Sequence, residues 1–561
     1  MVNKKRTGAQ SLIDCLEQQG VEYIFGFPGG ANIPIFDALI DSSLKLIRTR
    51  HEQGATHMAD GYARACGKAG VVLVTSGPGA TNTVTGIMTA FMDSVPMVVI
   101  CGQTVIPSLG LDAFQEADVS GITFPITKHS YLIKKSEDIP RVVKEAFHIA
   151  ETGRPGPVVI DIPKDISSLE FEPDYNVEIN LPGYTVPAHG DSAVISQVAE
   201  ELQKAKRPLL LLGHGALISD AGKAIRSLVD KMKIPVVNTL LGKGAFPESH
   251  PLCLGMLGMH GTAYANQAVI HCDLIMSIGS RWDDRIVGNQ EEFCKNAVKI
   301  HVDIDPAEAN KMITPEYFIL GDARLVVEEL NTVVQPGDTV EWVKQIAKWK
   351  KQLPLKYKKQ GGLKVQYILE ELCRITKGKA VVATDVGQNQ MWSAQFCLVE
   401  ARYNWLSSGG AGTMGFGFPA ALGAQLARPN DQVWAVVGDG GFQMTFFELA
   451  TAVIYKLPVK VIIMDNRFLG MVRQWQDLFY QNRLSGTPMP GNPDFVKLAE
   501  AFGAKGFRLK RNADVTKILT AALDYNDGPC LIHAEVEPKD NVFPMIPAGA
   551  VYETMMLEAR K

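Results

Sequence analysis

The sequence predicts an α/β protein of three doubly wound domains with mainly parallel sheets. Short runs of Val, Ile and Leu recur along the chain with helical patterns between them, as expected of strands that are buried on both faces of a parallel sheet. Two polar stretches, residues 167–191 and 335–362, interrupt this rhythm and divide the chain into three blocks. At ~150 residues per domain, a chain of 561 residues is long enough for three or four domains, and three is the economical number.

Each block contributes four or five predicted strands, and the blocks give the predicted domains. The expected strands are residues 21–27, 45–50, 71–75, 97–101 and 157–162 in the first block, 209–212, 234–237, 274–278 and 299–304 in the second, and 380–384, 433–437, 459–464 and 531–536 in the third. The predicted domains are residues 1–185, 190–335 and 360–540, followed by a C-terminal tail at 541–561.

The first and third blocks resemble each other. Residues 71–101 contain a strand, a Gly-Pro-Gly turn, a helix, a Val-Pro pair and a second strand, and residues 433–464 repeat this order with Gly-Asp-Gly and Leu-Pro. Chance is one explanation, because all βαβ units look broadly alike. The other explanation is a pair of related domains on either side of a different one.

Composition narrows the class of function. Lys and Arg total 56 against 60 for Asp and Glu, a net charge of −4, so no basic field favours binding to nucleic acid. No run reaches the ~18 uninterrupted apolar residues of a membrane span. The nine Cys include no CxxC pair, which is typical of a reducing compartment without zinc or a disulfide framework. Asp14 and Glu17 interrupt the apolar run that a secretory signal needs, so we expect a cytoplasmic protein.

Polar residues follow two successive strands of the third block. Gly438-Asp439-Gly440 stands between a strand and a helix, where small residues let backbone amides approach a phosphate and the helix N-terminus favours an anion. The next strand is followed by Asp465 and Asn466. Parallel neighbours would bring Asp439 and Asn466 to one sheet edge, and oxygen ligands completed by phosphate suit Mg²⁺. A turn cap is the alternative for Asn466, but the pair together predicts a metal–diphosphate site.

This arrangement resembles the signature of thiamine-diphosphate enzymes, and further motifs extend the resemblance along the whole chain. They occur in the order found in the large, catalytic subunits of biosynthetic acetolactate (acetohydroxyacid) synthases: His51-Glu52-Gln53-Gly54-Ala55, Ser76-Gly77-Pro78-Gly79-Ala80-Thr81-Asn82, Asp112-Ala113-Phe114-Gln115-Glu116, Leu257-Gly258-Met259-His260-Gly261, Arg281-Trp282-Asp283-Asp284-Arg285 and Met471-Val472-Arg473-Gln474-Trp475.

The resemblance implies a pyrimidine-binding first domain, a central FAD-binding domain and a diphosphate-binding third domain. Its cofactors would be thiamine diphosphate, Mg²⁺ and FAD, the flavin having no net redox role. In such enzymes the carboxylate at Glu52 hydrogen-bonds the pyrimidine ring and promotes loss of the proton from thiazolium C2, while the cofactor performs the carbon chemistry. From the residues alone, a Glu in the first turn of a helix is more often only a partner of the helix dipole than a catalytic group.

The cofactor contacts transfer by motif. The residues expected at thiamine diphosphate are Gly30, Glu52, Gln388, Asn389, Gly412, Met414, Gly440 and Gly441. The expected metal ligands are Asp439, Asn466 and the carbonyl oxygen of Phe468. Two positions depart from the family, Asn389 in place of His and Asp465 in place of Asn in many relatives, and for Met414 a plain core role is the alternative.

The resemblance also assigns the flavin and the substrates. The residues expected at FAD are Arg154, Gly213, Gly215, Thr239, Leu240, His260, Arg281, Asp283, Arg285, Asp303 and Asp322, although Gly-His-Gly alone is a weak dinucleotide signal. Arg281 would bind the carboxylate of the second 2-ketoacid, unless it is a surface residue paired with Asp283 or Asp284. Trp475 would narrow the acceptor pocket in favour of 2-ketobutyrate. The other active-site positions are Phe114, Gln115, Lys164 and Met471, with an ordinary surface role competing for Lys164.

The implied reaction decarboxylates pyruvate and ligates the two-carbon unit to pyruvate, giving 2-acetolactate, or to 2-ketobutyrate, giving 2-aceto-2-hydroxybutyrate, on the routes to valine, leucine and isoleucine. Glu52 and Asp439 lie in different blocks, and relatives build each site across a dimer interface, so a homodimer or homotetramer is implied, with a small regulatory subunit as a further partner. The rivals are a flavin-free catabolic synthase, a glyoxylate carboligase, which Glu52 disfavours, a pyruvate oxidase, and a non-catalytic nucleotide-binding or regulatory protein.

Overall fold

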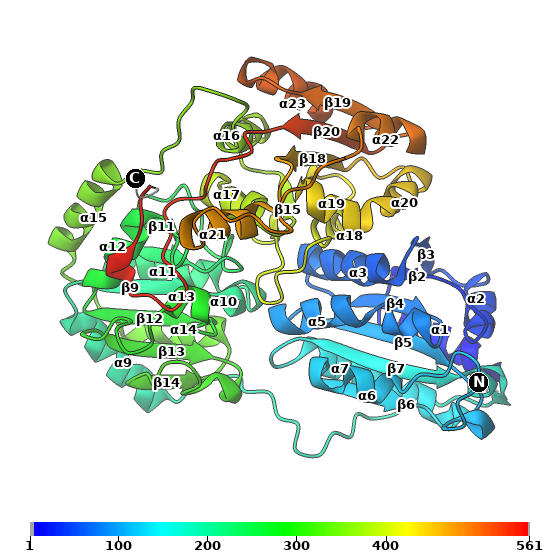
Figure 1. Cartoon of the computed structure of the whole chain (residues 1–561). Coiled ribbons are helices and arrows are strands. Elements are labelled where there is room, and N and C mark those ends of the chain that lie inside the picture. The colour runs from blue at the N-terminus through cyan, green and yellow to red at the C-terminus, as the bar shows by residue number, and fades with distance from the viewer. Residues whose placement is uncertain (1–4, 559–561) are drawn as a thin grey trace.

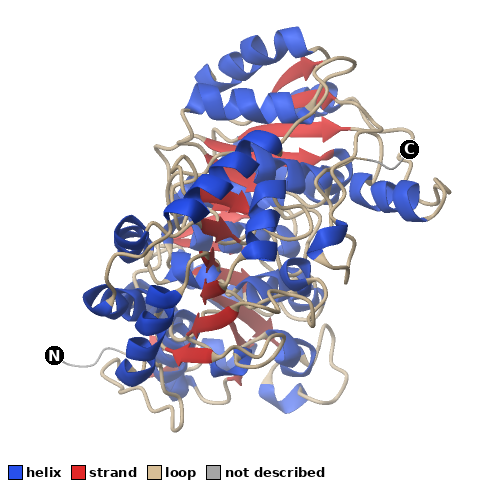
Figure 2. Cartoon of the chain, turned by 90° about the vertical axis from the view of Figure 1, so that its left-hand side faces the viewer, coloured by secondary structure: helices blue, strands red, loops and turns tan. Residues whose placement is uncertain are grey.

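A computed structural model describes residues 5–558 and divides them into three lobes, coloured blue to cyan, green, and yellow to red along the chain (Figure 1). Each lobe is built on a six-stranded sheet in which every pairing is parallel. A separate antiparallel pair joins β1 (Arg6–Thr7) to β8 (Glu170–Phe171). Helices cover both faces of the sheets (Figure 2). The predicted fold class is therefore confirmed.

The N-terminal lobe has the strand order β3-β2-β4-β5-β7-β6. Its strands are β2 (Tyr23–Gly26), β3 (Lys45–Arg48), β4 (Gly70–Val74), β5 (Met97–Gln103), β6 (His129–Leu132) and β7 (Pro157–Pro163). Its helices are α1 (Gly8–Gln18), α2 (Ile33–Leu39), α3 (Glu52–Cys66), α4 (Pro78–Thr81), α5 (Val84–Asp93), α6 (Val119–Thr123), α7 (Ile139–Glu151) and α8 (Lys164–Ser168).

The central lobe has the order β11-β10-β9-β12-β13-β14. Its strands are β9 (Pro208–Leu212), β10 (Val236–Asn238), β11 (Cys253–Met256), β12 (Leu274–Ile278), β13 (Val298–Asp303) and β14 (Tyr317–Leu320). Its helices are α9 (Ser192–Lys204), α10 (His214–Ile218), α11 (Gly222–Met232), α12 (Ala263–His271), α13 (Asp284–Val287) and α14 (Ala323–Val333), and α15 (Val340–Gln352) follows them.

The C-terminal lobe has the order β16-β15-β17-β18-β20-β19. Its strands are β15 (Val381–Thr384), β16 (Trp405–Leu406), β17 (Val433–Gly438), β18 (Lys460–Asp465), β19 (Lys505–Leu509) and β20 (Cys530–Glu535). Its helices are α16 (Val365–Thr376), α17 (Gln388–Phe396), α18 (Gly417–Ala427), α19 (Asp439–Thr445), α20 (Leu449–Ile454), α21 (Gly470–Phe479), α22 (Phe495–Phe502) and α23 (Val515–Asp524), with the 3₁₀ turn η5 (Phe446–Glu448) between α19 and α20.

The outer lobes share one topology. Numbered within each lobe, both sheets run 2-1-3-4-6-5, whereas the central sheet runs 3-2-1-4-5-6, the order of dinucleotide-binding folds. The similar segments 71–101 and 433–464 form the third and fourth strands of the two outer lobes. This equivalence favours two related domains around a different one over chance similarity.

Every predicted strand is present, and the strands that the sequence pattern missed lie mainly at sheet edges. These are β6, β11, β14, β16 and β19, together with the short pair β1 and β8. An interior strand such as β4 is buried at every position, whereas β19 is exposed or half-buried at four of five. Because an edge strand contacts a neighbour on one side only, it lacks the continuous apolar run by which the interior strands were predicted.

Helices α3 and α18 join the outer lobes at close range. A Cβ at Gly61 would lie 2.0 Å from the carbonyl oxygen of Ala420, and a Cβ at Gly423 would lie 1.9 Å from that of Met58. The two glycines therefore let the helix backbones touch. Residues of both lobes merge here into one apolar cluster, which includes Phe25 and Phe442.

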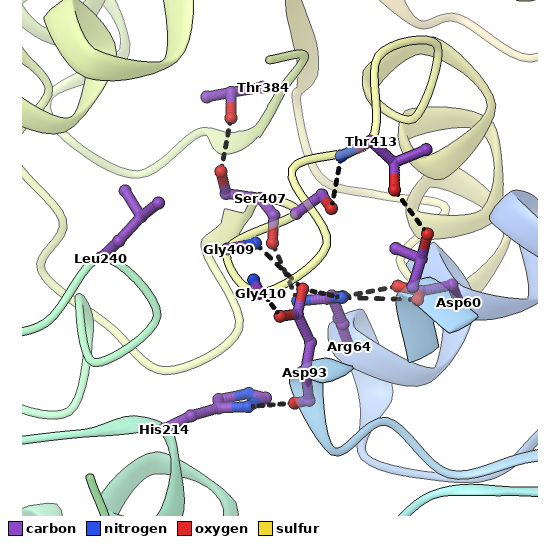
Figure 3. A network of polar contacts seen from close by, with 12 residues as sticks. Asp60, Arg64, Asp93, His214, Leu240, Thr384, Ser407, Gly409, Gly410 and Thr413 are labelled. Atoms are coloured by element: carbon purple, nitrogen blue, oxygen red, sulfur yellow. Dashed lines mark hydrogen bonds and ion pairs between the residues drawn. The ribbon is translucent and has the colours of Figure 1, made fainter. Parts of the chain in front are cut away.

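A buried polar network adds a second join and reaches all three lobes (Figure 3). Arg64, in the last turn of α3, pairs with Asp60 and with Asp93, whose carboxylate lies 2.8 Å from its guanidinium. The same Asp93 carboxylate accepts the backbone N–H groups of Gly409 (3.0 Å) and Gly410 (2.6 Å) in the C-terminal lobe. Its backbone carbonyl lies 2.7 Å from Nδ1 of His214 in the central lobe.

The end of the chain returns to the central lobe, as the red trace in Figure 1 shows. The backbone N–H of Ile546 donates to the carbonyl oxygen of Met259 at 2.8 Å, and the Tyr552 hydroxyl donates to the carbonyl oxygen of Ile286. Over residues 5–558, no helix has both the length and the apolar character that crossing a membrane requires.

Gly61→Ala should destabilise the fold even though alanine is the better helix former. Helix propensity alone predicts a gain of about 1 kcal/mol, but the new Cβ would overlap the carbonyl of Ala420, and overpacking typically costs roughly 1–3 kcal/mol or more. The Tm should therefore fall. Gly528→Ala is the control, because a Cβ there meets no atom within 4 Å. A Tm for Gly61→Ala at or above that of the parent would contradict the helix contact.

Candidate active site

The predicted site residues follow the carboxyl ends of strands in all three sheets, where open α/β sheets bind ligands. The fold thereby gathers them into three groups, one for each lobe. The groups of the central and C-terminal lobes line one cavity of about 780 Å³. Of the predicted residues of the N-terminal lobe, Arg154 also lines this cavity, whereas the others lie outside it.

The cavity brings most of the predicted residues together. Those that line it are Arg154, Gly215, Thr239, Leu240, His260, Arg281, Asp283, Arg285, Asp303, Asp322, Gln388, Asn389, Gly412, Met414, Asp439, Gly440, Gly441, Asn466, Phe468, Met471 and Trp475. Gly213 is not among them: a Cβ there would lie 2.1 Å from the carbonyl oxygen of Gly279, so this glycine packs the ends of β9 and β12 together. These are the two strands at which the order of the central sheet reverses, the usual place of a dinucleotide.

Asp439 begins α19 at the end of β17 and is almost fully buried. Its Oδ2 accepts a hydrogen bond of 2.6 Å from Asn492, whose amide also donates to Asp465 at 2.9 Å. Nε2 of His533 lies 2.8 Å from the second oxygen of Asp465. Burial raises the pKa of Asp439 above its ordinary value. Burial acts in the same sense on Asp465, but the hydrogen bonds from His533 and Asn492 prevail and lower its pKa. The hydrogen bonds thus keep the Asp465 carboxylate ionised beside that of Asp439.

Asn466 follows β18 on the neighbouring strand, as predicted. Its Oδ1 accepts the backbone N–H of Phe468 at 3.0 Å, and its amide donates to Gln388 at 3.3 Å. Within residues 5–558, no cluster of three or more His, Cys, Asp or Glu side chains forms a metal site unaided. One carboxylate with amide and carbonyl oxygens nevertheless fits Mg²⁺, a hard cation that is usually held by few protein ligands together with substrate phosphates.

Asp385 organises the glycine-rich wall of this half of the cavity. Its buried carboxylate accepts backbone N–H groups from Val386 (2.8 Å), Gly415 (3.1 Å) and Gly417 (3.1 Å). Burial raises the pKa of Asp385 to about 6, although these three hydrogen bonds oppose the rise. A Cβ at Gly441 would lie 2.2 Å from the same carboxylate, which explains the glycine there.

Met414 and Asn389 face the cavity rather than the core. Met414 is half-buried, and a Cβ at Gly440 would come within 3.4 Å of its Cε and 3.0 Å of Leu469 Cδ2, so the glycine keeps the space between them open. Asn389 is buried, yet its side-chain oxygen has no hydrogen-bond partner. A hydrogen-bond donor would satisfy that atom. The fit to a diphosphate rests on Gly440 and Gly441, which leave room for an anion at the N-terminus of α19.

The central lobe presents a neutral imidazole and a helix-capping carboxylate to the cavity, and Arg154 of the N-terminal lobe reaches the same part of it. Burial lowers the pKa of His260 to about 4, and its Nε2 has no partner. Arg154 is bound to Asp305 at 3.1 Å and to Glu308 at 2.7 Å. Asp322 caps α14 by accepting two backbone N–H groups. These orphaned and capping polar atoms flank the carboxyl edge of the central sheet, whose order reverses between β9 and β12, and together they fit a dinucleotide.

Arg281 and Trp475 approach the cavity from different lobes. Arg281 is half-buried, and no ion pair with Asp283 or Asp284 is formed within residues 5–558, where Arg285 contacts Asp284 instead. The Arg285 guanidinium also lies 5.9 Å from the centre of the Trp475 ring. Trp475 and Met471 occupy one face of α21, four residues apart.

The predicted residues of the N-terminal lobe other than Arg154 lie at the carboxyl edge of their own sheet. Gly30 follows β2, Glu52 follows β3, Phe114 and Gln115 follow β5, and Lys164 follows β7. Phe114 is 89% exposed, and Lys164 is exposed. None of the five lines the cavity of its own chain.

Several residues of the site were missed by sequence reasoning. Asp385, Asn492, His533 and Glu448 make contacts to residues that are distant in sequence, and no local motif marks them. Asn82, whose amide donates to Glu52 at 3.0 Å, stood in a quoted motif but was given no role. Its position after β4, on the same edge as Glu52, was the available signal.

Comparison with known proteins assigns the family. Three profiles of thiamine pyrophosphate enzymes match the chain: the N-terminal TPP binding domain at residues 6–122, the central domain at 195–330 and the C-terminal TPP binding domain at 385–534. The acetolactate synthase large subunit of Pyropia yezoensis is 48% identical over 98% of this chain and 95% of its own length. Those of Haemophilus influenzae and Lactococcus lactis are 45% and 46% identical over 99% of this chain, and 98% and 97% of their own lengths.

Each of the three matched domains lies within one of the three lobes, and similarity to the relatives runs through all of them. The chain therefore belongs to the thiamine pyrophosphate enzymes and, among them, to the family of acetolactate synthase large subunits.

Proposed function

We propose that this protein is the catalytic chain of an acetolactate synthase. It decarboxylates pyruvate and joins the two-carbon unit to a second pyruvate or to 2-ketobutyrate. The observation that carries the proposal is the juxtaposition in one cavity of the Asp439–Asn466 oxygen site with Arg281 and Trp475. A decarboxylase needs only the first pair, whereas a ligase also needs a place for an acceptor. The direct test is pyruvate turnover with product identification, with and without thiamine diphosphate, Mg²⁺ and FAD.

The C-terminal lobe holds the charged end of the cofactor. Asp439, Asn466 and the carbonyl oxygen of Phe468 bind Mg²⁺, and Gly440 and Gly441 leave room for the diphosphate at the N-terminus of α19. The helix dipole favours the anion there. Met414 supplies an apolar wall beside Gly440.

Glu52 exchanges a proton with the pyrimidine ring of thiamine diphosphate. Thiamine diphosphate, when bound, supplies a carbon nucleophile and an electron sink for decarboxylation of a 2-ketoacid. The Glu52 carboxylate keeps one oxygen on Asn82 and leaves the other available to the pyrimidine ring. A carboxylate in this place acts as a general acid–base group.

Arg281 and Trp475 select the acceptor. The guanidinium of Arg281 offers a forked set of donors to the carboxylate that both 2-ketoacids share. Trp475 and Met471 form the apolar part of the pocket, so the longer side chain of 2-ketobutyrate gains contact there. Phe114, Gln115 and Lys164 would reach the same pocket from the partner subunit.

The proposed assembly is at least a homodimer. Glu52 lies outside the cavity of its own chain, and the loop that follows β5 at the same edge exposes the large apolar side chains of Leu111 (71%) and Phe114 (89%). Symmetric pairing would cover them and bring Glu52 to the partner's Asp439 site. The name "large subunit" of the relatives supports a second, smaller chain as a regulatory partner.

FAD is proposed for the central lobe, with no net part in the reaction. The 3-2-1-4-5-6 sheet, the Gly213–Gly279 contact and the unpaired Nε2 of His260 support a dinucleotide there. These features favour a flavin-containing synthase over the flavin-free catabolic type.

Glu52→Gln should retain cofactor binding and lose most of the rate. The amide fills the same space but cannot accept and return a proton, and general acid–base assistance is commonly worth ~10²–10⁴-fold. The measurements are cofactor affinity, turnover, and exchange of the C2 proton of bound thiamine diphosphate by NMR. Glu178→Gln, at an exposed position of the connector, is the control and should change nothing. Unchanged C2 exchange in Glu52→Gln would contradict the assignment of Glu52 as the acid–base group.

Asp439→Ala should abolish Mg²⁺-dependent activity, because it removes the carboxylate from the metal shell. Asp527→Ala, exposed in the same lobe, is the control.

Mixing inactive Asp439→Ala and Glu52→Gln chains should restore activity, since a hybrid dimer keeps one intact site. For random pairing the recovery is about a quarter of the parent activity. No recovery from verified hybrids would contradict sites shared between subunits.

Trp475→Leu should erase most of the preference for 2-ketobutyrate, since one methylene in an apolar pocket is worth roughly 1–3 kcal/mol. Arg281→Ala should weaken capture of both acceptors while decarboxylation of the first pyruvate continues. The measurement is the product ratio when both 2-ketoacids compete. An unchanged ratio in Trp475→Leu would make that residue part of the core, and a defect confined to the first decarboxylation would remove Arg281 from the acceptor site.

A further inference from the structure

The backbone before Glu52 is held by the C-terminal lobe. The Glu448 carboxylate, in η5, accepts the backbone N–H groups of Arg50 (3.0 Å) and His51 (3.0 Å), the two residues that precede Glu52. It also accepts the Thr451 hydroxyl at 2.7 Å. Burial raises the pKa of Glu448 to about 7, so above neutral pH its charged form makes these contacts, in which charge strengthens the hydrogen bond.

Gly54 leaves room for this contact between Glu448 and the backbone before Glu52. A Cβ at Gly54 would lie 2.1 Å from Oε1 of Glu448, so any other residue would push the carboxylate away. His51 closes the first turn of α3 by accepting the N–H of Gln53 at 3.1 Å. These contacts fix where the Cα of Glu52 lies, but they leave the torsions of its side chain free.

One side chain restricts those torsions. Nδ2 of Asn82, directly after α4, donates to Oε2 of Glu52 at 3.0 Å. This is the single hydrogen bond to the Glu52 carboxylate among the described residues 5–558. The other oxygen, Oε1, lies 3.6 Å from the place of a Cβ at Gly79, so the glycine leaves space beside it.

The backbone of Asn82 is itself anchored, because its N–H donates to the carbonyl oxygen of Pro78 at 3.0 Å. A donor on a fixed backbone aims the carboxylate in one direction. The contact also engages one carboxylate oxygen and leaves the second for a different partner. This arrangement suits a carboxylate that must bind, through Oε1, a ring nitrogen of a cofactor held by the partner subunit.

We propose that Asn82 is a positioning residue for Glu52: its amide holds Oε2 so that Oε1 faces the pyrimidine ring of the cofactor in the shared site. The proposal rests on the proposed function, in which Glu52 exchanges a proton with the pyrimidine ring of the cofactor. Asn82 acts through Glu52 and does not itself take part in the proton transfer.

Asn82→Ala removes the donor, and Asn82→Asp keeps its shape while placing a negative charge against the carboxylate. Because small misplacements of a catalytic group cost up to ~10²-fold, we expect C2 exchange to slow about tenfold in Asn82→Ala and further in Asn82→Asp. Affinity for thiamine diphosphate with Mg²⁺, followed by tryptophan quenching, should stay within about twofold of the parent, because the diphosphate site lies on another lobe. Asn82 is half-buried, so these variants should fold.

Thr81→Ala is the matched control. Thr81 is exposed, and among residues 5–558 its hydroxyl hydrogen-bonds only to the carbonyl oxygen of Pro78 in its own helix. Its loss should therefore leave C2 exchange and affinity unchanged. Equal slowing in Thr81→Ala would show that the loop as a whole is sensitive, and it would overturn the specific role of Asn82.

The decisive readout is the double variant Glu52→Gln, Asn82→Ala. If Asn82 works through Glu52, adding Asn82→Ala to the Glu52→Gln chain should slow exchange no further, because the effects of coupled residues do not add. A full additional tenfold loss, or a loss of cofactor affinity that accounts for the slower exchange, would contradict the proposal. If Glu52→Gln alone leaves exchange intact, the proposed function fails at Glu52, which is a separate outcome from a failure of Asn82.

Discussion

The hydrogen bonds that the buried Arg64–Asp93 ion pair makes to the other two lobes are the interaction on which the arrangement of the lobes depends. A guanidinium that is removed from water must be fully paired, and Arg64 finds its partners in Asp60, in Asp93 and in the carbonyl oxygen of Ser407, 2.9 Å away in the C-terminal lobe. Asp93 in turn needs the amides of Gly409 and Gly410. Separating the outer lobes would leave the Arg64–Asp93 pair intact within the N-terminal lobe, but it would remove the carbonyl and the two amides that complete its hydrogen bonds. The segment that leads to Gly412 and Met414 is thereby fixed against α3.

That anchor has a geometric consequence for catalysis. Helix α3 begins at Glu52 and carries Arg64 in its last turn, and at 1.5 Å per residue the two lie about 18 Å apart along the axis. Holding the C-terminal end of α3 against the cavity wall of its own chain leaves Glu52 at the far end, on the exposed edge with Phe114. The same contact that builds the cavity therefore keeps Glu52 away from it, which is why we propose that the partner's cavity receives this carboxylate.

The sequence predicted what depends on burial and strand order, and it missed what depends on distant contacts. Interior strands such as β4 have continuous apolar runs, so they were found, whereas β19 lies at an edge and was not. Asp439 and Asn466 could be paired because consecutive parallel strands end at one edge. No such rule relates Glu448 to His51, which lie 397 residues apart, or marks Asn492 as the bridge between Asp439 and Asp465. Those contacts exist only once the lobes have packed.

The shared 2-1-3-4-6-5 order of the outer lobes explains why their halves of the site match. In both sheets the third strand leads into a glycine turn and a helix N-terminus, at Gly77 in one lobe and at Gly438 in the other. The two carboxyl edges can therefore oppose each other with similar spacing and different chemistry. In the proposed function, one edge carries the oxygens of the Mg²⁺ site, and the other carries the Glu52 carboxylate that Asn82 orients. We therefore propose that two lobes of one topology bind the two ends of thiamine diphosphate, and that the differently ordered central sheet binds FAD at its own carboxyl edge.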